Sequence, residues 1–373
     1  MRLKKTIVVS VITDLVSDQR VHKVCTFLHN KNFEVHLIGR ETKNSLPLQQ
    51  QVYQTERLYC FFNKGVLMYA EFMLRLFFKL FRKADILLSN DLDTLLPNFI
   101  HAYFKKVPLI YDSHEFFTGV PELDDSPRKK KIWQLLERFL LARTDKAYTV
   151  SDSIAAIYKA TYNVHMEVVR NLPRVKREEE NIDYTNPFPS GKFLILMQGA
   201  GINKGRGGEE LVQAMSLLPP HFHLVLIGSG TSWLDLKKLV EDLELGNQVT
   251  FIEKVPFNQL YYYTRQANVG VSLDKPLSLN YELSLPNKIF DYIHAAVPVL
   301  SSSVKEVKKI IDHYDIGITI DEISPGKIAD TLVGIHANTT AYNQWKRNTY
   351  RAARELCWEE EEKKLDRIYL SYY

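Results

Sequence analysis

Short apolar runs rich in β-branched residues alternate with helix-length segments along nearly all of this 373-residue chain. Strands that alternate with helices pair in parallel, so the pattern predicts an α/β fold with helix-wrapped parallel sheets. Helices are expected at 18–29, 67–81, 129–141 and 151–161, the last capped by Ser151. Strands are expected in the first half at 7–12, 33–38, 86–89, 109–112, 147–150 and 167–169.

The alternation is interrupted at 173–191, where a charged run and several prolines predict an interdomain linker. Strands are then expected at 193–197, 223–227, 249–252, 269–273, 297–300 and 317–320. Two successive open α/β units predict two Rossmann-like domains facing across a central cleft, with the second at 192–351 and the first at 1–172.

The composition limits which partners, metal sites and compartments are expected for this chain. The 48 basic and 44 acidic residues leave a formal net charge of +4, which does not favour a nucleic-acid partner. Cys25, Cys60 and Cys357 are far apart, give no metal spacing and fit a reducing compartment. The basic, apolar N-terminus is interrupted by Ser10 and Thr13, so we expect a buried first strand rather than a signal peptide.

Residues 284–298 read SLPNKIFDYIHAAVP and predict a helix that starts at Asn287 and Lys288, with Asp291 one turn later. The free amides of a helix N-terminus and a lysine suit a diphosphate, and a carboxylate suits ribose hydroxyls, so this segment fits a sugar nucleotide. The alternative is an ordinary amphipathic helix with a Pro-Asn start.

A glycine-rich loop, QGAGINKGRGGEEL, follows the strand at 193–197. Gly199, Gly201 and Gly205 let the backbone approach a ligand, and Lys204 and Arg206 add cations that suit a leaving phosphate. A plain turn remains the alternative for such a loop.

Polar residues follow three strands of the first half. His114 and Glu115 lie in DSHEFF, after the strand at 109–112. The carboxyl ends of parallel strands place functional groups at one sheet edge, so we expect these residues to converge there. Turn and cap roles explain many of them equally well. The acceptor-side candidates, which would lie at this edge near the hydroxyl group that receives a transferred sugar, are Asp14, Asp18, Arg20, Asn90 and Asp91.

The segment at 284–298 closely resembles the donor-site motif of retaining GT-B glycosyltransferases, family 4-like (group 1 glycosyltransferases), and the Lys204-Gly205 pair matches their phosphate loop. The resemblance implies a GT-B fold whose C-terminal helix, about 352–373, crosses back to the first domain. It implies that His114, with Glu115 beside it, lies near the reacting sugar. The implied donor-binding residues are Gly199, Gly201, Lys204, Gly205, Arg206, Val255, Pro256, Glu282, Leu285, Pro286, Asn287, Lys288 and Asp291.

Two departures from the family pattern stand out. The family has two carboxylates eight residues apart, but eight residues before Asp291 is Leu283, and Glu282 is one position off that register. The family also often has an arginine earlier in the glycine loop, where this chain has Ala200 or Gly201, and Arg206 is the substitute.

The implied activity is retaining transfer from a nucleoside-diphosphate sugar, with a UDP-sugar favoured, to a glycan or lipid-linked acceptor in surface polysaccharide biosynthesis. No metal cofactor is expected, because protein cations would neutralise the leaving phosphate. Asp91-Leu92-Asp93 matches the metal triplet of other glycosyltransferases but lies in the first domain. Alternatives are a sugar-nucleotide 2-epimerase on the same fold and a non-catalytic GT-B subunit that binds a partner glycosyltransferase.

Residues 65–83 form an apolar segment with one stripe of charges, Glu71, Arg75 and Lys79, at helical spacing. The segment is too short and too charged to span a bilayer. It is either a helix buried against the sheet or one that lies in a membrane interface. The protein is expected to be cytoplasmic, and in the second case it is peripheral on the inner face of the plasma membrane.

Overall fold

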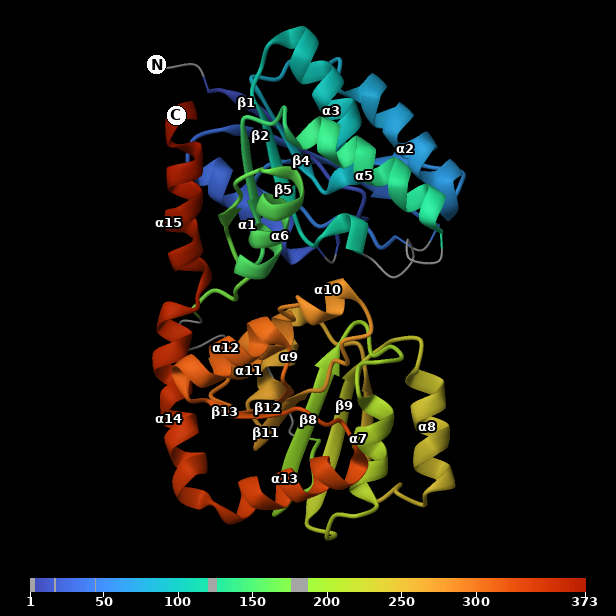
Figure 1. Cartoon of the computed structure of the whole chain (residues 1–373), viewed down its shortest axis with the longest axis vertical. Helices are drawn as coiled ribbons and strands as arrows, with labels where there is room; N and C mark the ends of the chain where they lie inside the picture. Colours follow the sequence, from blue (N-terminus) through green and yellow to red (C-terminus); the bar gives the residue numbers. More distant parts are fainter. Residues whose placement is uncertain (1–3, 17, 44, 120–125, 176–186) are drawn as a thin grey trace. The chain divides into compact units, whose positions relative to one another are not determined.

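The computed structural model describes the chain apart from residues 1–3, 17, 44, 120–125 and 176–186. It contains two compact units, Met1–Asn171 with Glu361–Tyr373, and Leu172–Glu360. Each unit is built on its own parallel sheet with helices on it (Figure 1). Most of the linker predicted at 173–191 lies outside the described residues.

The first unit has a seven-stranded parallel sheet in the order β3-β2-β1-β4-β5-β6-β7. Strands β1, β4 and β5 are buried throughout and occupy the centre. Their carboxyl ends therefore meet at one edge, where the polar clusters were expected. The strands are β1 (Thr6–Ser10), β2 (Glu34–Glu41), β3 (Gln54–Tyr59), β4 (Ile86–Asn90), β5 (Leu109–Ser113), β6 (Lys146–Thr149) and β7 (Glu167–Val168).

Helices α1, α2, α5 and α6 correspond to the four predicted helices, whereas α3 was not predicted. Ser151 caps α6, because its hydroxyl accepts the amide of Ile154. Strand β3 was not predicted. It is an edge strand that pairs only with β2, and an edge strand does not need the continuous apolar run that marks a central strand. The helices are α1 (Gln19–Asn30), α2 (Gly65–Lys79), α3 (Leu92–Lys105), η1 (Phe117–Gly119), α5 (Pro127–Leu141) and α6 (Asp152–Tyr162).

The second unit has a six-stranded parallel sheet in the order β10-β9-β8-β11-β12-β13. Its strands are β8 (Phe193–Gly199), β9 (Phe222–Gly228), β10 (Val249–Glu253), β11 (Val269–Ser272), β12 (Val299–Ser302) and β13 (Gly317–Ile320). Its helices are α7 (Gly208–Met215), α8 (Trp233–Asp242), α9 (Phe257–Thr264), α10 (Leu279–Glu282), α11 (Asn287–His294), α12 (Lys305–Tyr314), α13 (Pro325–Ala337) and α14 (Thr339–Glu355).

Alternate residues of β8 enter two separate apolar clusters. Ile195 and Met197 belong to one cluster, and Leu194 and Leu196 to the other. Because successive side chains of a strand point to opposite faces, both faces of this sheet are covered. Burial of both faces explains why these strands appear in the sequence as continuous apolar runs.

Strand β12 begins two residues later than predicted. The amide of Val297 donates to the Tyr292 carbonyl at the end of α11, so this residue closes the helix instead of opening the strand. The final helix, α15 (Trp358–Tyr369), is followed by η2 (Leu370–Tyr372). Tyr369 is fully buried in the first unit and its ring contacts Phe27 of α1, so the chain returns to that unit.

Candidate functional site

A buried ion pair joins α1 to β5 at the sheet edge of the first unit. Arg20 donates through Nε and Nη2 to the carboxylate of Asp112, at 3.0 Å and 2.6 Å, and through Nη1 to the Val169 carbonyl at 2.7 Å. Burial alone would raise the pKa of Asp112, but Arg20 and then His114 hold it below its usual value. Asp112 is therefore a buried carboxylate that Arg20 keeps ionised at the end of β5.

Asp91 has a strained backbone at the end of β4. Its φ of 58° and ψ of 169° lie in a region that is essentially restricted to glycine, at a cost of roughly 1–3 kcal/mol. The conformation lets its amide donate to the Asp112 carbonyl at 2.9 Å and its carboxylate accept the His114 amide at 2.8 Å. Strain of this kind concentrates at functional sites, which directs attention to the ends of β4 and β5.

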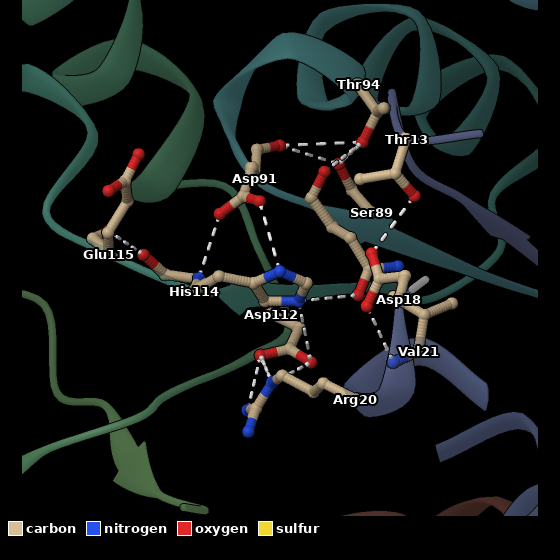
Figure 2. Close-up of polar contacts among 12 residues, drawn as sticks. Thr13, Asp18, Arg20, Val21, Ser89, Asp91, Thr94, Asp112, His114 and Glu115 are labelled. Atoms are coloured by element: carbon tan, nitrogen blue, oxygen red, sulfur yellow. Dashed lines mark hydrogen bonds and ion pairs between the residues drawn. The ribbon is translucent and has the colours of Figure 1, made fainter. Parts of the chain in front are cut away.

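His114 lies between these carboxylates (Figure 2). Its Nδ1 is 3.3 Å from Asp91, and its Nε2 is 3.2 Å from the Asn90 side-chain oxygen and 3.6 Å from Asp112. Burial alone would lower the pKa of His114, but Asp91 and then Asp112 raise it to about 9. The raised pKa favours the imidazolium form, in which both ring nitrogens are hydrogen-bond donors.

The other first-unit candidates have different positions. Asp18 caps α1 by accepting the Val21 amide and also binds Thr13, while Asp14 accepts the Val16 amide. The carboxylate of Glu115 is exposed and points away from the imidazole, so Asp91 and Asp112 are the groups that orient the ring (Figure 2).

A buried carboxylate supports the loop that carries His114. Glu137 of α5 accepts hydrogen bonds from Thr118 of η1, at 3.1 Å, and from Tyr158 and Tyr162 of α6, at 3.0 Å and 2.6 Å. Tyr158 also contacts the Ser113 hydroxyl at 3.0 Å. The loop after β5 is therefore tied to two helices.

In the second unit, the glycine loop packs against the chain that follows β11. Gly205 and Gly207 have φ of 83° and 75°, which favour glycine. A Cβ on Gly207 would lie 2.6 Å from the Leu273 carbonyl oxygen, and the Lys275 amide donates to the Gly205 carbonyl at 2.8 Å. The glycines are thus needed for this close approach, while Lys204 is exposed.

A buried carboxylate holds two cations beside this loop. Asp274, which follows β11, is only 1% exposed. Its oxygens lie 3.1 Å from Arg206 Nη1 and 3.8 Å from Lys288 Nζ. Arg206 also stacks over the Tyr281 ring at 4.2 Å. Burial lowers the pKa of Lys288, with Arg206 acting in the same direction and Asp274 against it.

Asp291 is oriented by a residue that the sequence analysis missed. Gln198, buried at the end of β8, donates to Asp291 at 3.0 Å and accepts the Thr264 hydroxyl at 2.8 Å. Asp274 was missed too. Both are polar residues at the carboxyl ends of buried strands, and this signal could have identified them.

The remaining donor candidates surround this region or lie near it. Pro286 precedes α11, Asn287 begins it, and Glu282 is exposed at the end of α10. Val255 packs against the apolar core of the second unit, which favours a packing role, and Pro256 is exposed at the start of α9. Among the described residues, no group of three or more His, Cys, Asp or Glu side chains could hold a metal ion.

Comparisons with known proteins agree with this architecture. Residues 18–174 match the family described as Glycosyltransferase Family 4, and residues 178–352 match Glycosyl transferases group 1. A search of curated protein sequences gave no significant match.

Solved structures share the fold over the whole chain. Sucrose-phosphate synthase (tll1590) from Thermosynechococcus elongatus superposes with a TM-score of 0.76 at 16% identity, covering 99% of each chain. Anabaena Alr3699/HepE in complex with UDP-glucose superposes with a TM-score of 0.74 at 13% identity, covering 99% of this chain and 100% of that one. WaaG, a glycosyltransferase involved in lipopolysaccharide biosynthesis, superposes with a TM-score of 0.73 at 14% identity, covering 97% of this chain and 99% of that one.

Two parallel α/β units with a returning C-terminal helix define a GT-B enzyme fold, as the sequence analysis predicted. With the two family matches, the chain is a group 1 glycosyltransferase.

Proposed function

We propose that this glycosyltransferase takes a sugar from a nucleoside-diphosphate sugar, with UDP favoured, and transfers it with retention to a glycan or lipid-linked acceptor in surface polysaccharide biosynthesis. The arrangement of Arg206, Asp274 and Lys288 beside the glycine loop carries this proposal, because two cations and loop amides suit a diphosphate. The UDP-glucose complex of HepE and the lipopolysaccharide role of WaaG support the base and the pathway.

The donor would be held by residues of the second unit. Arg206 and Lys288 would neutralise the diphosphate as the bond from its oxygen to the anomeric carbon breaks, so no metal is required. Asp291, held by Gln198, would accept the ribose hydroxyls. The acceptor oxygen forms the new bond on the same face of the sugar, and its proton passes to the departing phosphate oxygen.

Residues of the first unit would serve the reacting sugar and the acceptor. The His114 imidazolium, whose two N–H groups face Asp91, Asn90 and Asp112, would supply positive charge for the reacting sugar, since Asp91 and Asp112 keep it charged. Acceptor hydroxyls would bind near Asp91 and Asn90. In this proposal His114 provides charge and position, and proton removal falls to the leaving group.

A thermal-shift titration with UDP, GDP, ADP and CDP and their sugars tests the donor site. A ligand at 100 times its Kd stabilises the native state by about 2.7 kcal/mol. We expect a shift with UDP that disappears in Lys288→Ala and persists in Lys308→Ala, whose lysine is exposed on α12. No shift with any nucleotide would reject the donor site. Binding without turnover on any acceptor would favour the non-catalytic subunit.

We also propose peripheral attachment to the inner face of the plasma membrane through residues 65–83. Helix α2 buries Met68, Phe72 and Leu76 and leaves Leu74 and Phe78 largely exposed, so it has both a packed face and an outer apolar face. No helix in the described part of the chain is long and apolar enough to cross a membrane. Vesicle binding that does not weaken in Leu74→Ser/Phe78→Ser would contradict this attachment.

A further inference from the structure

The outer face of unit 1 over α2, α3 and α5 is apolar well beyond residues 65–83. The three helices lie side by side against the sheet (Figure 1). Six large apolar side chains of these helices are between 58% and 77% exposed, and exposed apolar side chains that gather on one side of a protein often mark an interaction site. They are Leu74 and Phe78 of α2, Tyr103 and Phe104 of α3, and Ile132 and Leu135 of α5.

Ring contacts connect the three helices into one surface. Tyr69 of α2 contacts Trp133 of α5, with ring centroids 5.6 Å apart. Phe99 of α3 contacts Phe139 of α5 at 5.7 Å. These contacts join the three helices, and we call their outer side, with its six exposed apolar residues, the α2–α3–α5 face.

The exposed charged side chains within α2, α3 and α5 are all basic. Each helix has a single carboxylate, and all three helices lie within the described part of the chain. Glu71 pairs with Arg75 and accepts the amides of Phe61 and Phe62, while Asp93 and Glu137 are buried. Asp145, beyond α5, accepts the Leu109 amide.

The basic residues, in contrast, point outward. Arg128, Lys129, Lys131 and Arg138 of α5 are all exposed. Arg128, Ile132, Leu135 and Phe139 repeat at intervals of three and four, so cationic and apolar groups share one face of the helix. Lys106, exposed after α3, adds a further cation.

We infer that the α2–α3–α5 face binds the surface of an anionic bilayer, with α5 supplying the electrostatic attachment. Apolar side chains would enter the boundary between headgroups and acyl chains, and Lys and Arg would lie on lipid phosphates. A second copy of the chain fits poorly, because dimerisation through this face would bring two basic surfaces together. The inference rests on the peripheral attachment proposed above. It adds that the lipids are anionic and that α5, in addition to α2, selects them.

Co-sedimentation with vesicles tests the inference on the full chain. We expect binding to vesicles of phosphatidylcholine with phosphatidylglycerol, and much weaker binding to phosphatidylcholine alone. Each basic residue near an anionic surface contributes about fivefold in affinity. Neutralising Arg128, Lys129, Lys131 and Arg138 to Ser should therefore lower the partition coefficient at least about tenfold.

A matched variant separates local from overall charge. Changing Lys238, Lys305, Lys327 and Lys346, four exposed lysines of the second unit, to Ser alters the net charge equally and should leave binding intact. Equal loss in both variants, or equal binding to neutral and anionic vesicles, would overturn the inference. So would a concentration-dependent dimer that Ile132→Ser/Leu135→Ser abolishes. The thermal shift that UDP causes in the α5 variant shows whether the variant is folded and whether its donor site is intact. The donor-site proposal and the membrane proposal can therefore fail independently.

Discussion

Replacing Arg20 with Leu tests how the first-unit site is held together. The change leaves Asp112 buried without the three hydrogen bonds from Arg20, and it leaves the Val169 carbonyl without its donor. Removing one partner of a buried pair costs about 3–5 kcal/mol. His114, 3.6 Å from Asp112, compensates in part, so we expect about 3 kcal/mol at neutral pH.

Native-state hydrogen exchange of the β1 and β5 amides measures this loss within the first unit, which avoids assuming that two units unfold together. The pKa of Asp112 is lowered in the folded chain, so its contribution is present above the unfolded pKa and is lost as pH falls. The destabilisation should therefore shrink in acid. Arg138→Leu, at an exposed arginine, is the control and should change stability by less than about 0.5 kcal/mol. A loss below about 1 kcal/mol in Arg20→Leu would refute the reasoning.

Three further predictions concern charge and backbone. The raised pKa of His114 contributes up to about 3 kcal/mol to the free energy of unfolding. This contribution is fully present below about pH 6.5 and is lost as pH rises through about 9. The free energy of unfolding of His114→Gln should lack this pH dependence, and a profile like that of the wild type would contradict the prediction. In Asp274→Asn, Lys288 loses the anion that favours its charged form, so the UDP-induced thermal shift should disappear at a lower pH on the alkaline side than in the wild type. Gly207→Ala should destabilise the second unit by at least about 1 kcal/mol in urea unfolding and remove the UDP shift, whereas Gly326→Ala, whose added Cβ meets nothing within 4 Å, should do neither.

Much of the candidate site could be predicted because its residues follow apolar strands. His114 and Asp91 come directly after such runs, and parallel pairing of β1, β4 and β5 brings their ends together. The roles within the cluster could not be predicted. Glu115 is adjacent to His114 in sequence, yet Asp91 and Asp112 contact the imidazole, because the chain bends after β5 and the Glu115 carboxylate points away from the ring (Figure 2).

The sequence by itself determined the fold class, the two runs of parallel strands and the glycine loop, since local periodicity and glycine spacing depend only on nearby residues. Only the tertiary structure showed that Asp274 lies between Arg206 and Lys288, that Gln198 orients Asp291, and that β3 is a strand. The same holds for the α2–α3–α5 face. Which of its apolar residues are exposed depends on how three helices pack against one sheet, and these contacts join residues far apart in the chain.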